Sequence, residues 1–182
     1  LMIKAIYTIL ILGSMFINKS NTKILYDFTD ENNLKSWSIV DDVVMGGRSS
    51  GSLNLDTNGN GSFNGRVSLE NYGGFSSVRC RVKNFNLSNN SFIVLKVFGD
   101  NKVYQLRIKS KYYDRHVYVK NFYAKDEWQE IEIPLNSMEP YFRGRKLSIN
   151  NFEDNSIVEF GILIGNKVNE DFSLLIDYIL AK

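Results

Sequence analysis

Cysteine and histidine are almost absent from this chain. The single cysteine, Cys80, excludes an internal disulfide and any zinc site built from several cysteines. The single histidine, His116, excludes metal sites with two histidine ligands and leaves little for histidine-based catalysis. We therefore expect no metal site, no cofactor and no catalytic residues. Cys80 is interpreted as a small hydrophobic residue of the core.

An excess of charge of either sign is also missing. The chain carries 22 basic and 20 acidic residues, and two of the basic ones, Lys4 and Lys19, lie in its first 20 residues. This balance argues against nucleic-acid binding by bulk charge. Basic side chains do alternate along two segments, and we interpret them as a salt-bridged, solvent-facing stripe of one sheet: Arg79, Arg81, Lys83, Arg107 and Lys109.

Residues 1–20 differ in character from the rest. An apolar run from Ala5 to Ile17 follows Lys4 and is shorter than the roughly 20 residues that a membrane-spanning helix needs. This pattern is typical of a secretory signal peptide, so we expect the protein to be exported to the periplasm or the medium, with a mature chain that begins between Ser20 and Lys23. An uncleaved segment that tethers the chain to a membrane and a buried first element are the alternatives.

From residue 23 onward, apolar side chains recur at every second position, which predicts β-strands. In the segment 103–109, for example, apolar Tyr104, Leu106 and Ile108 alternate with polar residues. The segment 172–180 is expected to bury Phe172, Leu174, Ile176 and Tyr178. Ten or eleven such strands, separated by Asn-Gly turns, predict one all-β domain over residues 23–182, a sandwich or jelly roll of two packed sheets. A longer loop is expected at 135–146.

Two short motifs suggest chemistry, and both have a simpler explanation. Residues 47–51 match the G-x-S-x-G pattern of a hydrolase nucleophile, but a strand rather than a helix is predicted after them, so Ser49 is interpreted as a loop residue. Residues 56–61 match the first half of a calcium loop, but the twelfth position is Val67 instead of a glutamate. We interpret this segment as a hairpin turn.

Aromatic side chains are the clearest surplus. They crowd one predicted hairpin and the long loop: Tyr112, Tyr113, His116, Tyr118, Phe122, Tyr123, Tyr141 and Phe142. Aromatic faces with polar edges suit the binding of sugars or protein segments, and they also suit the core of a sandwich.

Two stretches are more specific. Residues 37–49 contain Asp-Val-Val-Met-Gly-Gly-Arg-Ser, and residues 63–79 contain Phe-Asn-Gly followed by Asn-Tyr-Gly-Gly-Phe-Ser-Ser-Val-Arg. These stretches resemble the D-x-V-M-G-G-x-S, F-x-G and N-x-G-G-F-x-S-x-R motifs of the complex I intermediate-associated protein 30 family. Further likenesses follow in order at 99–104, 128–134, 142–145 and 176–179. The resemblance covers residues 25–182.

The resemblance implies a galactose-binding-domain-like jelly roll, related in fold to carbohydrate-binding modules. It also implies an assembly-factor-like, chaperone-like role without enzymatic activity. We therefore expect a protein partner, or alternatively a glycan, no nucleic acid, and contact with a membrane only through the N-terminal segment. The residues singled out for binding or for the motifs are Trp37, Asp42, Met45, Gly46, Gly47, Ser49, Gly73, Gly74, Phe75, Ser77, Arg79, Asp100, Tyr104 and Arg143.

The two glycine-containing loops, 42–49 and 71–79, are expected to meet at one end or face of the sandwich. Asp42 and Arg79 are the opposite charges in the two motifs, and a pair between them would fix both loops. Met45 and Phe75 are expected to close the end of the sandwich. Two interpretations remain open, a purely structural junction and a groove for a ligand or partner.

Overall fold

The computed structural model describes residues 22–29 and 34–182, and also leaves the side chains of Val44 and Met45 undescribed. The predicted N-terminal signal segment therefore lies outside the described residues. Within the described ranges, no helix is long and apolar enough to cross a membrane.

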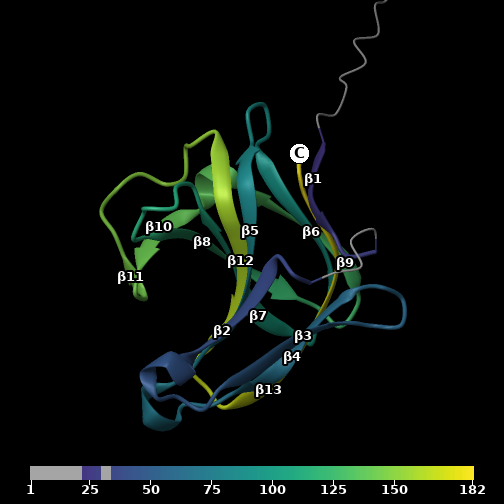
Figure 1. Ribbon diagram of the computed structural model, residues 1–182, viewed down its shortest axis with the longest axis vertical. Helices are drawn as coiled ribbons and strands as arrows, with labels where there is room; N and C mark the ends of the chain where they lie inside the picture. The colour runs from purple at the N-terminus through teal and green to yellow at the C-terminus, as the bar shows by residue number, and fades with distance from the viewer. Residues whose placement is uncertain (1–21, 30–33) are drawn as a thin grey trace, which may run out of the picture.

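Two antiparallel sheets account for the described chain, which confirms the predicted all-β sandwich (Figure 1). The first sheet runs in the order β3-β4-β13-β6-β9, with β1 paired to the end of β13. Its strands are β1 (Lys23–Asp27), β3 (Ser50–Leu55), β4 (Gly61–Val67), β6 (Phe92–Phe98), β9 (Trp128–Pro134) and β13 (Glu170–Ala181).

The second sheet has seven strands in the order β11-β10-β8-β7-β12-β5-β2. These are β2 (Trp37–Asp41), β5 (Ser76–Asn86), β7 (Lys102–Lys109), β8 (Val117–Ala124), β10 (Glu139–Phe142), β11 (Arg145–Lys146) and β12 (Ser156–Ile164). The pair β10–β11 occupies the segment that was expected to be a loop. Short 3-10 helices complete the described chain: η1 (Asp42–Met45), η2 (Glu70–Tyr72) and η3 (Leu135–Ser137).

The core lies between the sheets and follows the predicted alternation. Tyr104, Leu106 and Ile108 are at most 1% exposed, and so is Cys80, as expected for a core residue. The alternation fails at one place in β13. The pairing of β13 with β6 shifts register between Ile176 and Tyr178, so that Ile179 is buried and Tyr178 is only half-buried.

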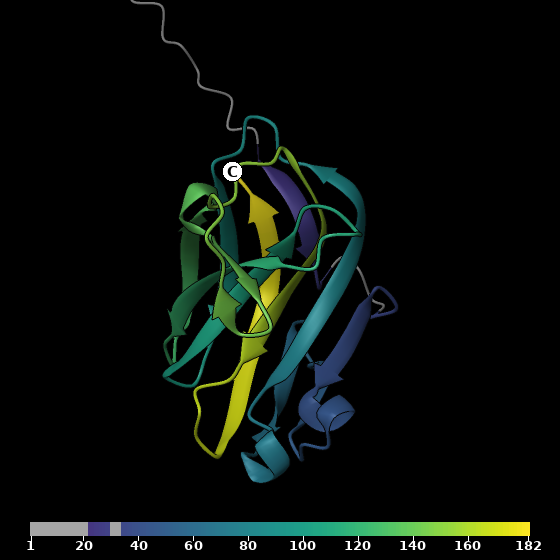
Figure 2. The ribbon, with the colours of Figure 1, turned by 90° about the vertical axis from the view of Figure 1, so that its left-hand side faces the viewer.

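The two ends of the sandwich differ. One end holds β1 beside the C-terminal end of β13, and the other holds η1 and η2 next to each other (Figures 1 and 2). The segment 56–61 is a hairpin turn between β3 and β4, as predicted. In this turn the Asp56 carboxylate accepts hydrogen bonds from the backbone N–H groups of Asn58 and Asn60, both at 2.8 Å.

Candidate binding surfaces

The two motif loops meet at the η1–η2 end, as the sequence predicted. Asp42, the first residue of η1, is completely buried, and its carboxylate accepts four hydrogen bonds. The backbone N–H of Ser49 donates to Oδ1 at 3.0 Å, and the Ser49 hydroxyl donates to Oδ2 at 2.5 Å. The backbone N–H groups of Gly74 and Phe75 also donate to Oδ2, at 2.6 and 3.1 Å. One carboxylate thus joins two loops that are distant in the sequence.

This arrangement keeps Asp42 ionised. Burial alone would raise the pKa of its carboxyl, but the hydrogen bonds from Ser49, Gly74 and Phe75 together outweigh burial and lower the pKa. The Ser49 hydroxyl also accepts a hydrogen bond from the backbone N–H of Ser68 at 3.0 Å. Its contacts are those of a residue that holds the loops together, which agrees with the interpretation of Ser49 as a loop residue.

The motif glycines make room for this carboxylate. A Cβ on Gly47 would lie 2.2 Å from Asp42 Oδ1, and a Cβ on Gly73 would lie 2.7 Å from Asp42 Oδ2. Gly46 has a different role, because its φ of +90° closes η1 in a conformation that side-chain-bearing residues rarely adopt. Any other residue at position 47 or 73 would displace the carboxylate.

Apolar side chains project from these two loops and from Leu69, just before the second loop. Val43 is 60% exposed, Leu69 is 41% exposed and Tyr72 is fully exposed. We call the segments 42–49 and 68–75 the loop end. The side chain of Met45 lies outside the described residues, so its predicted role in closing the sandwich is not tested.

The expected ion pair between Asp42 and Arg79 is wrong. Four donors from Ser49, Gly74 and Phe75 surround Asp42, and within the described residues Arg79 has no carboxylate within ion-pair distance. The reason is the register of β5. It places Arg79 opposite Ser38, inside the sheet and three residues away from the strand end where the loops meet. The Asp42 carboxylate needs no arginine, because backbone N–H groups donate the hydrogen bonds that stabilise its negative charge.

Other residues singled out from the sequence have structural contacts. The Ser77 hydroxyl donates to the carbonyl oxygen of Val40 at 2.8 Å and so joins β5 to β2. Trp37 packs in the core with its ring centroid 5.4 Å from that of Phe160. Arg143 is exposed at the tip of the β10–β11 hairpin, and its guanidinium lies 5.4 Å from the centre of the Phe142 ring.

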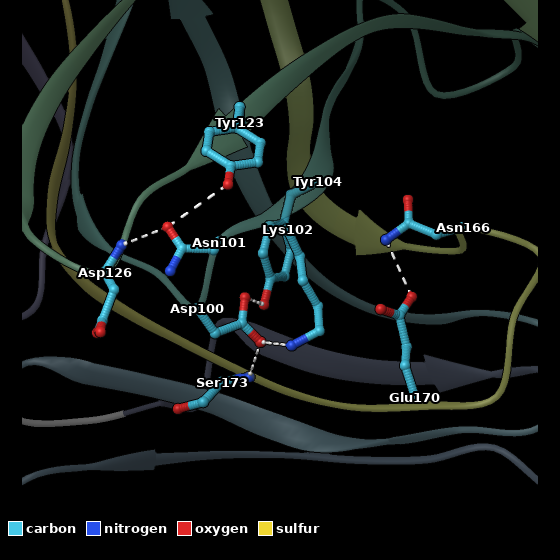
Figure 3. Close-up of polar contacts among 9 residues, drawn as sticks. All are labelled: Asp100, Asn101, Lys102, Tyr104, Tyr123, Asp126, Asn166, Glu170 and Ser173. Carbon is cyan, nitrogen blue, oxygen red and sulfur yellow. Dashed lines mark hydrogen bonds and ion pairs between the residues drawn. The ribbon is translucent and has the colours of Figure 1, made fainter.

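Asp100 and Tyr104 do come together, in a cluster that links the sheets (Figure 3). The Tyr104 hydroxyl donates to Asp100 Oδ1 at 2.9 Å. Asp100 Oδ2 accepts from Lys102 Nζ at 2.7 Å and from the backbone N–H of Ser173, in β13 of the other sheet, at 2.9 Å. Burial, and then the charge of Asp100, raise the pKa of the Tyr104 phenol. The carboxylate of Asp100 thus has its hydrogen-bond partners within the cluster.

The aromatic surplus is divided between core and surface. Tyr118 and Phe122 are buried, whereas Tyr112, Tyr113 and Tyr123 are at least half exposed. A hollow of about 250 Å³ lies over β7, β8 and β10. Of the surplus aromatic residues only Tyr141 lines it, together with Gln105, Val119, Lys120, Asn121 and Glu139.

The basic stripe is not fully salt-bridged, in contrast to the expectation. Arg81 lies 3.7 Å from Glu159, but among the described residues neither Arg79 nor Arg107 has an ion-pair partner. Both line a smaller hollow of about 50 Å³ on the outer face of the seven-stranded sheet. Burial, and then the neighbouring charge of Arg79, lower the pKa of Arg107 to about 10. The sequence predicted that both arginines lie on one sheet face. It did not predict that Gly161 of β12 lies between them, because that depends on which strands flank β12.

Comparison with known proteins gives a family. Residues 26–176 match the family model described as complex I intermediate-associated protein 30 (CIA30). A curated relative from Drosophila melanogaster, named "Complex I intermediate-associated protein 30, mitochondrial", is 24% identical over 186 aligned positions. The match covers 87% of this chain and 62% of that relative, so the chain spans less than two thirds of the relative's length. The expectation of export is wrong, because the relative is a mitochondrial protein.

Two solved structures show the same fold. A family 11 carbohydrate-binding module from Clostridium thermocellum, solved with a β-1,3-1,4-mixed-linked tetrasaccharide, aligns with a TM-score of 0.63 at 15% identity, covering 88% of this chain and 94% of the module. A family 30 module from a cellulosomal cellulase of the same organism aligns with a TM-score of 0.54 at 16% identity, covering 75% and 90%. At these identities the likeness shows a common fold and nothing about ligands.

Proposed function

Because the chain belongs to the complex I intermediate-associated protein 30 family, we propose that it is a non-enzymatic binding protein that holds an intermediate of complex I assembly. We place the contact with the partner at the loop end. The observation that carries this proposal is the construction of that end. The buried carboxylate of Asp42 holds two family-motif loops in place. At this end, apolar side chains are exposed to solvent and do not belong to the core.

Exposed apolar side chains on a rigid support favour protein binding. Tyr72 is fully exposed to solvent, and Val43 and Leu69 are about half exposed at the same end of the sandwich. Exposed aromatic and aliphatic groups gain most from burial against a partner, and a rigid support lowers the entropy lost on binding.

Crosslinking and capture of partners from mitochondrial extract test the proposal. The variants Tyr72→Ser and Leu69→Ser should each reduce capture of complex I subunits by about tenfold. Tyr113→Ser is the matched control, because Tyr113 is 96% exposed but lies in the loop between β7 and β8. Full capture by Tyr72→Ser, or an equal loss with Tyr113→Ser, would contradict the placement of the site. No capture of complex I subunits by the wild-type chain would contradict the function.

Glycan binding is the second candidate function. It is favoured by the hollow of about 250 Å³ beside Tyr141, whose polar lining from Gln105, Asn121 and Glu139 offers groups that pair with hydroxyls. A glycan array decides between the two candidates. Binding of a defined oligosaccharide that is lost in Asn121→Ala and Tyr141→Ala, while no protein is captured, would replace the first proposal by this one.

A further inference from the structure

Two arginines flank one glycine in the middle of the seven-stranded sheet. Gly161 of β12 pairs with Arg79 of β5 on one side and with Arg107 of β7 on the other. The residues before and after this glycine, Phe160 and Ile162, are buried in the core, so Gly161 and the two arginines lie on the outer face.

The missing side chain at Gly161 shapes this face. A Cβ there would lie 2.4 Å from the carbonyl oxygen of Val78 and 3.3 Å from Cγ of Arg79. Glycine thus lets the Arg79 side chain approach β12 closely. A hollow of about 50 Å³ remains, lined by both arginines, by Gly161 and by Ser77, Val117 and Glu159, among others. This volume admits a few water-sized groups and is too small for a sugar ring.

The charges in the hollow are not balanced within the described chain. The buried Nε of Arg107 has no hydrogen-bond acceptor, and neither arginine forms an ion pair. The one carboxylate of the lining, that of Glu159, lies near Arg81 at 3.7 Å. Two neighbouring cations in a partly buried hollow repel each other, and an anion between them would remove this cost.

We propose that Arg79 and Arg107 form a binding site for a carboxylate group of an acidic segment of the protein partner. This inference rests on the proposed function as a protein binder. The guanidinium group is planar and binds carboxylates through paired N–H donors, so two of them can hold a single carboxylate from both sides. The size of the hollow fits a carboxylate of three heavy atoms, and its lining includes no aromatic side chain against which a sugar would stack.

The probe for this site is a short peptide of alternating glutamate and serine residues, with its glutamine–serine counterpart as the uncharged control. Calorimetric titration at neutral pH and low salt should show binding of the glutamate peptide alone. Arg107→Gln and Arg79→Gln should each weaken it by about tenfold or more. Arg107→Lys, which keeps the charge but loses the paired donors, should weaken it by a smaller factor.

Arg66→Gln is the matched control for bulk charge, since it removes one positive charge from the other sheet, where Arg66 pairs with Asp171 at 3.2 Å. An equal loss in Arg66→Gln would overturn the proposal, and so would wild-type protein that fails to bind the glutamate peptide. Binding of an oligogalacturonate in its place would overturn it in favour of an acidic glycan. The melting temperature of each arginine variant confirms that the domain is folded.

The two proposals fail separately. Tyr72→Ser should leave binding of the glutamate peptide unchanged, because Tyr72 lies at the loop end and does not line the hollow. If capture of complex I subunits depends on Tyr72 but not on either arginine, the protein binder stands and the carboxylate site is overturned.

Discussion

The backbone N–H of Gly74 donates a 2.6 Å hydrogen bond to the carboxylate of Asp42, which lies 32 positions earlier in the chain. Asp42 itself has no exposed surface; its two bonds with Ser49 are buried, and those from Gly74 and Phe75 are partly buried. Removing the acceptor would leave buried and partly buried donors without partners, and each fully buried one costs about 1–3 kcal/mol.

Asp42→Ala should therefore lower the free energy of unfolding by about 3–5 kcal/mol. Urea unfolding followed by tryptophan fluorescence measures this difference. The matched control is Asp171→Ala, since Asp171 has a 76% exposed side chain in an ion pair with Arg66, and its loss should change stability by about 0.5 kcal/mol or less. An Asp42→Ala variant as stable as this control would show that the carboxylate does not hold the loops.

The same carboxylate predicts how stability depends on acid. Hydrogen bonds that outweigh burial lower the pKa of Asp42, and hydrogen bonds from Asn60, Asn58 and Gly59 likewise lower the pKa of Asp56. A carboxyl whose pKa is lower in the folded state stabilises the fold above its unfolded pKa, about 3.9. This contribution is lost as the pH falls through the lower folded values. The unfolding midpoint should thus fall steeply below about pH 4, and less steeply in Asp42→Ala.

The buried faces of the strands could be predicted from the sequence because alternation is a local property. Tyr104, Leu106 and Ile108 reveal their buried face without any knowledge of neighbouring strands. The bulge near Tyr178 could not be predicted in this way, because it arises from the pairing of β13 with β6 and leaves no mark on the composition of the strand.

The candidate sites could be predicted only in part. The contact between the two glycine loops was predicted correctly, but the pairing of Asp42 with Arg79 was not. The sequence shows where charged side chains are, and it does not show which backbone N–H groups of Gly74 and Phe75 point at a carboxylate. The neighbourhood of Arg79 and Arg107 depends on β12 lying between β5 and β7. That order is set by long-range pairing, which no single segment of the sequence specifies.

Gly46→Ala and Gly47→Ala should have different costs although the residues are adjacent. A Cβ on Gly46 meets nothing within 4 Å, so the cost is the strain of a φ of +90°, about 1–2 kcal/mol. A Cβ on Gly47 would lie 2.2 Å from Asp42 Oδ1 and would move the carboxylate, which should cost about 3 kcal/mol. In an Asp42→Ala background the second cost should shrink, and a double-mutant cycle measures this coupling. If Gly47→Ala destabilised the wild type and Asp42→Ala equally, Gly47 would not act through the Asp42 carboxylate.

The thiol of Cys80 should react only when the domain unfolds. Cys80 is 1% exposed and lies between the two sheets, opposite Trp37 and Phe160 of the neighbouring strands. Labelling with a thiol reagent such as dithionitrobenzoate should be slow in the native protein and immediate in guanidinium chloride. Complete labelling of the native protein within seconds would show that this part of the core opens readily.

Tyr104→Phe tests the cluster that joins the sheets. It removes the hydroxyl that donates to Asp100 at 2.9 Å and should lower the free energy of unfolding by about 1–2 kcal/mol at neutral pH. Tyr113→Phe, at an exposed position, should have no measurable effect.

The dependence of stability on alkaline pH gives a second test of Tyr104. Burial, and then Asp100, raise the pKa of the Tyr104 phenol, so above about pH 10 the unfolded chain loses a proton that the folded chain keeps, and stability falls by about 1.4 kcal/mol per pH unit for this group. Tyr118 and Tyr178 add to this fall, because burial raises the pKa of both. Chemical unfolding between about pH 7 and 11 should therefore give a shallower alkaline decline in Tyr104→Phe than in the wild type. Parallel declines would mean that Tyr104 ionises as readily in the folded chain as in the unfolded one.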